Sequence, residues 1–361
     1  MTVTGIIAEC NPFHEGHAYL IRKAREITGA DFVIAALSGD YVQRGLPAVM
    51  PWEYRVRELL ANGVDLVIAL PLYVSTGGAD YFARGGVALL ERTGVVTDIV
   101  FGSETGDLTA LQNTADALLT STGPQAQFQA SLRSTFQNGG TFAGALTDAA
   151  GGTVPHTPND LLGAHYLKAL SLSGSGIRPH AVPRIACPSA TERRQAIFAQ
   201  RAQGPSTAGI PVLSCDDLSG ALLHALAANR DYSAYLDVSG DLSNRIRRCL
   251  NQYTGFQQFA ALVQSRQYTL SRIRRCLLFV LLGIRKTEGK SCCVRVLGFR
   301  KEAGPLLRHI AKNGAIPLST SLSFADLSQE DIRAAHLWEM LVVNRTKQPL
   351  RHEQQRQIVI L

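Results

Sequence analysis

The sequence predicts an α/β fold: a Rossmann-like, doubly wound parallel sheet followed by a mostly helical, basic C-terminal domain. Two observations predict it. Short apolar runs alternate with amphipathic runs through the first two-fifths of the 361 residues, which indicates strands alternating with helices. Between residues 241 and 310, fourteen Lys and Arg stand against three Asp and Glu. We expect domains at residues 1–202 and 203–361, because residues 203–209 (Gln-Gly-Pro-Ser-Thr-Ala-Gly) are typical of a linker.

The strands of the predicted sheet are almost entirely apolar, which is typical of strands buried on both faces. They are Thr2–Ala8, Phe32–Leu37, Leu66–Leu70 and Ile99–Phe101. A last strand is expected at Ile177–Ile185. Helices are expected between them, at His17–Thr28, Trp52–Asn62, Ala79–Arg92 and Asn159–Leu172, with a polar helix from Ala190. Gly29, Gly63 and Gly94 closely follow three of these helices, as C-terminal stop signals do.

The second half of the chain reads as helical to about Ile284, extended around Ser291–Leu297, and helical again at Pro305–Asn313. The composition, 46% hydrophobic and 18% charged, is that of a globular protein with a sizeable core. No apolar run approaches the roughly 20 residues of a membrane span, and the N-terminus does not resemble a secretory signal. Seven cysteines without paired spacing indicate a reducing compartment, so we expect a cytoplasmic protein.

The most informative segment is the turn between the first strand and the first helix, which holds His14, Gly16 and His17. An H-x-G-H turn in this context is typical of a nucleotide-phosphate site. Gly16 lets the backbone approach a ligand closely, and the helix N-terminus offers unpaired N–H groups to an anion. Both histidines can then donate hydrogen bonds where negative charge builds up on a phosphate. A metal pair is the alternative, but no third ligand with zinc-like spacing is found in the sequence, so no metal site is expected.

We expect three further loops at the same sheet edge, because right-handed crossovers bring the carboxyl ends of parallel strands together. They are Ser38–Ala48, Pro71–Gly78 and Gly102–Glu104. The loop Ser38–Ala48 carries Arg44 between glycines and suits a phosphate or carboxylate, or is simply a solvated loop. Gly102 could admit an adenine or ribose against the backbone, or mark a plain turn. Near residue 190, Ser189 or Thr191 could cap a helix with Arg194 on the face of Thr191, and an ordinary capped helix is the alternative.

The net charge of +7 and the pI near 9.1 are consistent with an anionic partner. Several arginine clusters of one region favour a phosphodiester backbone, although solvated helix faces are the simpler explanation for any one cluster. Aromatic side chains near them could stack on bases or belong to the core. These are Tyr253, Phe256, Tyr268 and Phe299.

These motifs resemble those of the bacterial tRNA(Met) cytidine acetate ligases, members of the HxGH nucleotidyltransferase-like superfamily. The resemblance spans nearly the whole chain in order. It rests on Glu9, Asn11-Pro12-Phe13-His14-x-Gly16-His17, Ser38-Gly39, Val42-Gln43-Arg44-Gly45, Asn62-Gly63-Val64-Asp65-Leu66-Val67-Ile68, Leu70-Pro71, Phe101-Gly102-Ser103-Glu104, Pro158-Asn159, Leu162-Gly163, Arg184-Ile185 and Arg295-Val296-Leu297-Gly298-Phe299.

The resemblance implies an ATP-dependent ligase, with Mg²⁺ accompanying ATP. Acetate would be activated as acetyl-adenylate, and the acetyl group would pass to N4 of the wobble cytidine of elongator tRNA(Met). His14 and His17 would be the catalytic residues. By matching position, the ATP site would comprise Ile7, Ala8, Glu9, Cys10, Asn11, Pro12, Phe13, His14, Glu15, Gly16, His17, Ala18, Tyr19, Leu20, Gly102, Asn159, Arg184, Thr191 and Arg194. The basic C-terminal region would hold tRNA through Arg245, Arg247, Arg248, Arg272, Arg274, Arg275, Lys286, Lys290, Arg300 and Lys301.

The chain departs from the family pattern at several positions. Glu15 replaces the more usual asparagine, Cys10 the usual tyrosine, and Asp160 a second asparagine. A tyrosine-histidine-aspartate stretch expected after Arg184 is missing. Two alternatives therefore stay open: a small-molecule adenylyltransferase, and a non-catalytic RNA-binding protein with a degenerate nucleotide site.

Overall fold

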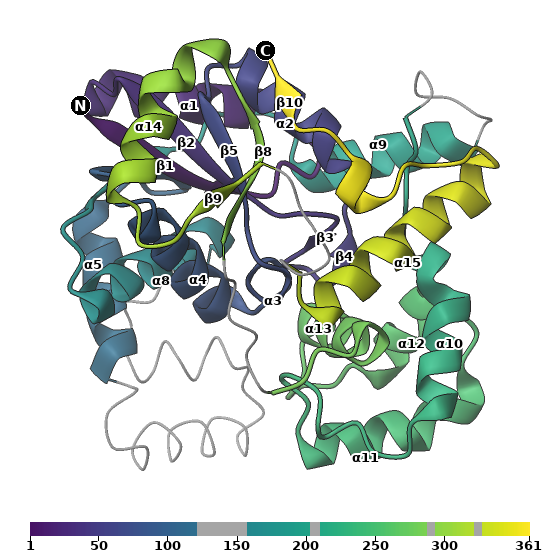
Figure 1. The fold of residues 1–361 in the computed structure, drawn as a ribbon. Coiled ribbons are helices and arrows are strands. Elements are labelled where there is room, and N and C mark those ends of the chain that lie inside the picture. Colours follow the sequence, from purple (N-terminus) through teal and green to yellow (C-terminus); the bar gives the residue numbers. More distant parts are fainter. Residues whose placement is uncertain (121–156, 203–209, 287–292, 321–326) are drawn as a thin grey trace.

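The computed structural model describes residues 1–120, 157–202, 210–286, 293–320 and 327–361. Its centre is a mostly parallel sheet (Figure 1). Five parallel strands are β1 (Val3–Ala8), β2 (Phe32–Leu37), β5 (Leu66–Ala69), β6 (Asp98–Ser103) and β7 (Arg178–Pro183). They lie in the order β7-β6-β1-β2-β5. The chain therefore proceeds outward from β1 on one side and then returns to its other side, so the sheet is doubly wound with its switch point between β1 and β6.

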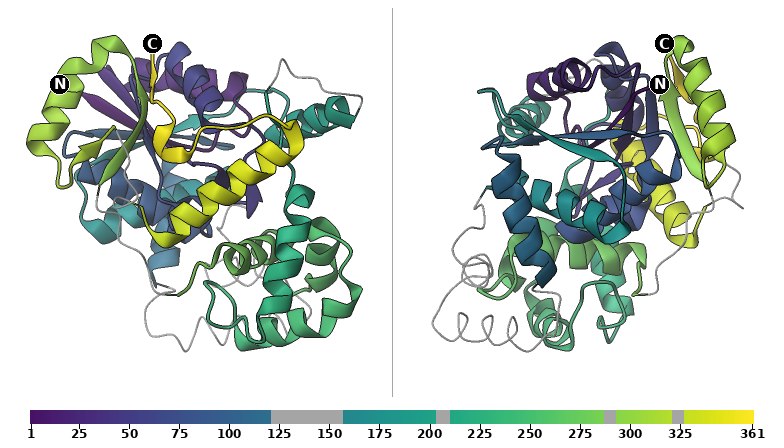
Figure 2. Two further views of the ribbon diagram at one scale, coloured as in Figure 1. Left: turned by 45° about the vertical axis from the view of Figure 1, so that its right-hand side comes forward. Right: turned by 90° about the vertical axis from the view of Figure 1, so that its left-hand side faces the viewer.

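Helices cover both faces of this sheet (Figures 1 and 2). On one face α1 (Glu15–Thr28) and α2 (Trp52–Ala61) bury side chains such as Ile21 and Leu59 against alternate residues of β1, β2 and β5. On the other face the buried cluster joins strand residues to α4 (Ala79–Arg92), α5 (Leu108–Thr120), α8 (Pro158–Ser173) and α14 (Gly304–Asn313). The inner strands β1, β2, β5 and β6 are thus buried on both faces, which explains their apolar sequences, whereas most of the edge strand β7 is exposed or half-buried.

A second hydrophobic core lies among helices of the C-terminal half, beside the sheet (Figure 1). It is built by α10 (Ser219–Ala228), α11 (Gly240–Cys249), α12 (Phe256–Val263), α13 (Leu270–Leu282) and α15 (Gln329–Thr346), with 3₁₀ turns at Cys215–Leu218 (η1) and Leu250–Gln252 (η2). A short hairpin from the N-terminal half, β3 (Tyr41–Val42) with β4 (Leu46–Pro47), joins this core. Tyr41 is buried within it, and its hydroxyl donates to the carbonyl of Ala334 at 3.3 Å.

The chain does not stay in the helical unit after α13. Strand β8 (Val294–Phe299) returns to the sheet and pairs antiparallel with β5, while β9 (Leu318–Ser319) and β10 (Val359–Ile360) pair with β8. Residues 203–361, which we expect to form a mostly helical domain, thus also contribute β8, β9 and β10 to the sheet. Buried residues of β8, Val294 and Val296, occupy the core of the sheet, so hydrophobic burial joins the two halves.

The element limits expected from the sequence are close to the observed ones. Ala79–Arg92 and Phe32–Leu37 are observed with the expected limits, and α1 starts two residues earlier, at Glu15. The remaining elements are α3 (Leu72–Ser75), α9 (Ala190–Ala202), η3 (Lys301–Ala303) and η5 (Glu353–Gln355). The expected linker at residues 203–209 lies outside the described residues. In the described part of the chain no helix is both long and apolar enough to cross a membrane.

Candidate functional site

A cavity of about 400 Å³ opens at the carboxyl ends of β1 and β6, at the switch point of the sheet. Its wall includes fifteen of the nineteen residues expected at an ATP site. They are Ile7, Ala8, Glu9, Cys10, Asn11, His14, Gly16, His17, Tyr19, Leu20, Gly102, Asn159, Arg184, Thr191 and Arg194. Pro12, Phe13, Glu15 and Ala18 do not line it. One cavity therefore collects segments that are up to 187 residues apart in the sequence (7 to 194).

The two histidines are fixed by the backbone of the helix that they begin. His14 is the N-cap of α1, and its Nδ1 accepts the Gly16 N–H at 3.1 Å. His17 Nδ1 accepts the His14 N–H at 3.2 Å, so the pair forms a reciprocal capping box. The imidazole rings lie 3.9 Å apart between centroids. Because each Nδ1 accepts a hydrogen bond, the ring proton of each neutral imidazole is on Nε2.

Both imidazoles are held neutral. Burial, followed by the positive charges of Arg193 and Arg184, lowers the pKa of His14. Burial and the neighbouring His14 lower the pKa of His17 to about 3. The rings thus act as Nε2–H donors at neutral pH rather than as cations. A neutral donor fixed at a helix N-terminus matches a phosphate oxygen without needing an extra proton.

The opposite wall of the cavity is organised by two acidic residues that bind protein groups. Glu104 accepts from Asn159 Nδ2 at 2.6 Å and from Arg184 at 3.4 Å through the same carboxylate oxygen. Asp160 is buried and accepts from Ser103, from the backbone of Glu104 at 2.9 Å and from Thr157 at 2.8 Å. Burial raises the pKa of Asp160, but these hydrogen bonds outweigh it and leave the pKa lowered. The aspartate thus ties the end of β6 to α8.

Helix α9 closes the cavity from the side of the H-x-G-H turn. Ser189, not Thr191, caps it: Ser189 Oγ accepts the Glu192 N–H at 3.2 Å, and the Glu192 carboxylate accepts the Ser189 N–H at 2.6 Å. Arg194 donates to Thr191 Oγ1 at 2.9 Å and to the carbonyl of Asn11 at 2.8 Å. Arg193 pairs with Glu15 at the start of α1. Glu15, which departs from the family pattern, therefore anchors α9 to the start of α1, although it does not line the cavity.

Arginines from three separate elements gather at the cavity. Arg44 and Arg194 line it, and Arg274 of α13 lies near both. Burial, followed by the charges of Arg44 and Arg274, lowers the pKa of Arg194. Burial and Arg44 act likewise on Arg274. Mutual repulsion of this kind is relieved by a bound anion, so the arrangement favours a highly charged ligand.

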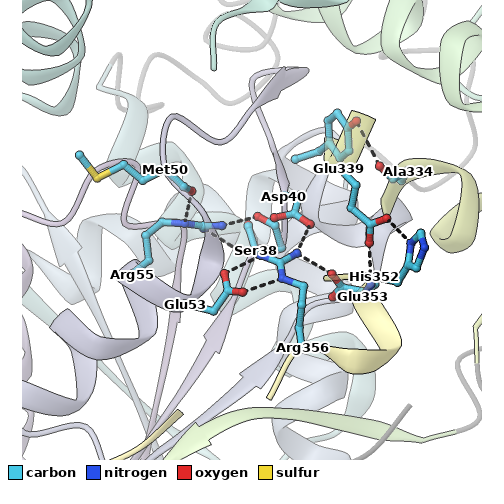
Figure 3. A network of polar contacts seen from close by, with 12 residues as sticks. Ser38, Asp40, Met50, Glu53, Arg55, Ala334, Glu339, His352, Glu353 and Arg356 are labelled. Atoms are coloured by element: carbon cyan, nitrogen blue, oxygen red, sulfur yellow. Dashed lines mark hydrogen bonds and ion pairs between the residues drawn. The ribbon is translucent and has the colours of Figure 1, made fainter. Parts of the chain in front are cut away.

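A buried arginine that the sequence analysis missed holds the loops that carry these groups. Arg55 of α2 is 1% exposed. It donates to the carbonyls of Ser38 at 2.7 Å and Met50 at 3.3 Å (Figure 3). It also donates to the carbonyls of Glu9 at 2.9 Å and Gly39 at 2.5 Å. The ends of β1 and β2 are thus clamped by one side chain. The local sequence gave no sign of this, because Arg55 lies on an ordinary amphipathic helix.

The residues expected to bind tRNA fall into different environments. Arg247 and Arg248 on α11 and Lys286 are exposed. Arg245 donates to carbonyls at the end of α12, Arg272 and Arg275 pair with Asp237, and Arg274 binds Gln257 near the cavity. Arg300 pairs with Asp65, and Lys301 follows Arg300 in the sequence. Both lie at the amino ends of the parallel strands, which is the sheet edge opposite the cavity. Lys290 lies outside the described residues.

Residues 1–355 match the family described as HIGH Nucleotidyl Transferase. A tRNA(Met) cytidine acetate ligase of Thermoanaerobacter sp. (strain X514) is 32% identical over 90% of this chain and 89% of its own length. The enzyme of Fervidobacterium nodosum is 33% identical over 90% of this chain and 84% of its own. The chain belongs to the tRNA(Met) cytidine acetate ligase family.

The fold agrees with this membership. The crystal structure of Thermotoga maritima TmcAL bound with alpha-thio ATP superimposes with a TM-score of 0.87 at 27% identity, over 100% of both chains. The ligand-free form of that protein gives the same values. The two proteins therefore share one fold over their full length.

Proposed function

We propose that this protein is an ATP- and acetate-dependent ligase that acetylates N4 of the wobble cytidine of elongator tRNA(Met). The observation that carries the proposal is the cavity at the switch point of the sheet. In this member of the family, two neutral histidines converge there with Arg44, Arg184 and Arg194. An acetate oxygen attacks the α-phosphorus of ATP, and pyrophosphate leaves. The cytidine N4 amine then attacks the acetyl carbonyl, loses a proton and displaces AMP, which gives N4-acetylcytidine.

The first step brings two anions together, so fixed positive charge and donors must offset their repulsion. His14 and His17 are placed to donate through Nε2 to phosphate oxygens, and the N-terminus of α1 adds its dipole. Arg44, Arg194 and Arg184 supply charge along the wall. A preorganised donor of this kind contributes about 3–4 kcal/mol to transition-state stabilisation, and positioning of the two reactants contributes roughly 7–11 kcal/mol.

Adenine and ribose are proposed to lie near Gly102 and Asn159, where a Cβ on Gly102 would meet Arg184 at 3.8 Å. We propose that Mg²⁺ enters with ATP. Glu104 is already engaged through both oxygens, by Asn159 and Arg184 at one and by the Asp160 N–H at the other. A protein acting on tRNA would work in the cytoplasm.

The tRNA is proposed to bind across the helical unit, where Arg247, Arg248 and Lys286 are exposed. Their charge can neutralise phosphates without reading sequence. Arg274 is proposed to act at the cavity instead, because it binds Gln257 and repels Arg44. Arg274 would thus help to position the anticodon at the cavity. Arg247, Arg248 and Lys286 would bind the tRNA backbone on the helical unit.

The test is incorporation of labelled acetate into tRNA by purified protein with ATP and Mg²⁺, with acetyl-CoA replacing acetate and ATP in a parallel reaction. We expect label at the wobble cytidine of elongator tRNA(Met) only with acetate and ATP, together with pyrophosphate release. Labelling from acetyl-CoA alone would contradict the proposal. Pyrophosphate release without RNA labelling would favour a small-molecule adenylyltransferase, and tRNA binding with neither would favour a non-catalytic RNA-binding protein.

A further inference from the structure

A cluster of metal-ligand side chains lies outside the nucleotide cavity, on helix α15. His336 and Glu339 are one turn apart on this helix, and His352 comes from the segment that follows it. Each offers one ligand atom, and these three atoms lie within 4.8 Å of one another. Glu339 is 6% exposed, whereas His352 is exposed and His336 is half-buried. A buried carboxylate therefore stands under two accessible imidazoles.

We propose that His336, Glu339 and His352 bind one divalent transition-metal ion of the Zn²⁺ class. Two imidazoles and a carboxylate form a ligand set suited to Zn²⁺ and unsuited to Mg²⁺ or Ca²⁺, which prefer oxygen ligands only. Tetrahedral Zn²⁺ with bonds of about 2.0–2.2 Å holds its ligand atoms about 3.4 Å apart. His352 Nδ1 and Glu339 Oε2 already lie 3.0 Å apart, and the imidazole centroids of His336 and His352 are 6.1 Å apart. Small rotations of the two imidazoles suffice to close the site.

The carboxylate is held in place from behind. Glu339 Oε1 accepts the backbone N–H of Glu353 at 2.6 Å, which leaves Oε2 directed to His352 (Figure 3). Outer hydrogen bonds of this kind orient a metal ligand and raise affinity. A cation also offsets the cost of burying the Glu339 carboxylate, since the imidazoles bind metal in their neutral form.

These residues are spaced by three and then thirteen positions and match no common zinc pattern, so the sequence alone does not indicate the site. Only the fold brings His352 onto α15. The segment that it begins contains Glu353 and Arg356, which pair with each other at 2.5 Å, and Arg356 reaches Asp40 at 3.4 Å (Figure 3). A metal ion here would therefore fasten the C-terminal segment to α15 and, through Arg356, to the loop after β2.

The test uses tag-free, chelator-treated full-length protein titrated with ZnCl₂ in a calorimeter, with His336→Ala and His352→Ala as variants and the exposed His309→Ala of α14 as the matched control. We expect one Zn²⁺ per chain and a higher melting temperature for wild type and His309→Ala. Binding should weaken at least tenfold in the two site variants. MgCl₂ should give neither heat nor a shift.

Cobalt separates this site from cysteine ligation, since the chain has seven cysteines. The Co²⁺-loaded protein should show weak visible bands without the intense near-ultraviolet charge-transfer band of thiolate ligation. Unchanged Zn²⁺ affinity in His336→Ala and His352→Ala, a thiolate band, or no binding by wild-type protein would each overturn the proposal. Because neither variant changes a buried side chain, loss of folding does not account for a negative result.

Discussion

His14 and His17 act through their neutral form. Each gives its Nδ1 to a backbone N–H of the same turn, and burial prevents either from carrying charge at neutral pH. Helix capping, a local interaction, thus fixes the tautomer of each imidazole before a ligand binds. Two uncharged imidazoles side by side do not repel each other, as two imidazolium cations would. The arginines of the cavity supply the positive charge instead.

Replacing His17 with alanine should lower acetyl-adenylate formation by about 10²–10³-fold, the loss expected for one preorganised donor. ATP-dependent pyrophosphate exchange in the presence of acetate measures this step without tRNA. His309→Ala, on the exposed face of α14, should retain wild-type exchange. Equal rates in His17→Ala and wild type would show that the imidazole does not act on the phosphate.

The pH dependence of stability should reveal the low pKa of His17. An unfolded histidine has a pKa of about 6.5, whereas burial and His14 hold the folded value at about 3. Between these two pH values the unfolded chain binds more protons than the folded protein. The free energy of unfolding therefore carries the full contribution of His17 above about pH 6.5, and this contribution is lost as pH falls. His17→Gln keeps an acceptor but cannot titrate. From pH 7 to pH 5 its free energy of unfolding should fall by about 2 kcal/mol less than that of wild type.

Urea unfolding of ligand-free protein at several pH values measures this difference. His309→Gln, at an exposed position of α14, is the matched control and should follow the wild-type curve. Parallel curves for His17→Gln and wild type would mean that His17 titrates normally in the folded protein.

At the scale of elements, the site depends on how two loops are held against one helix. Arg55 of α2 donates three hydrogen bonds to carbonyls of the turns after β1 and β2 and a fourth to the carbonyl of Met50. Glu9 lies on the same turn and accepts the Gln43 N–H at 2.6 Å, while burial raises the pKa of its carboxyl. Hydrogen bonds to Arg55 and Glu9 therefore hold the loops that line the cavity in place.

Arg55→Met should destabilise the protein by about 3 kcal/mol, because it leaves several buried carbonyls without a donor at roughly 1–3 kcal/mol each. The matched control is Arg57→Met, two residues along α2 and exposed, which should change the free energy of unfolding by less than about 0.5 kcal/mol. Urea denaturation compares the two. Equal stabilities would show that the carbonyls find other partners.

At the scale of the whole molecule, the two cores are joined by the returning C-terminal chain. Arg356 lies between the rings of Trp52 and Trp338, 4.9 Å and 5.0 Å from their centroids, and pairs with Glu53 at 2.5 Å. Trp52 belongs to the sheet core and Trp338 to the helical core. Burial and the charge of Arg356 act in opposite directions on Asp40, and burial prevails, which raises its pKa to about 7.

This architecture separates basic residues that look alike in the sequence, and tRNA binding should follow the separation. Arg247→Ala with Arg248→Ala should weaken binding and reduce the slope of log affinity against log salt by about 1.4–1.8, at roughly 0.7–0.9 for each lost phosphate contact. Acetyl-adenylate formation should stay at the wild-type rate.

The matched control is Arg300→Ala with Lys301→Ala, which removes two charges across the sheet from the cavity. Filter binding to elongator tRNA(Met) over a range of salt concentrations measures both variants. A larger loss of affinity in the control than in the α11 variant would contradict the proposed tRNA path.

The sequence by itself determined what depends on neighbouring residues. The strands, most helices and the H-x-G-H turn follow from periodicity, glycine stops and capping within a few positions, and these local preferences survived folding. It did not determine contacts between distant segments, because nothing local records them. The antiparallel pairing of β8, the clamp of Arg55 on the ends of β1 and β2, the approach of Arg274 to Arg44 and the seating of His352 on α15 arise only when burial of apolar surface brings those segments together.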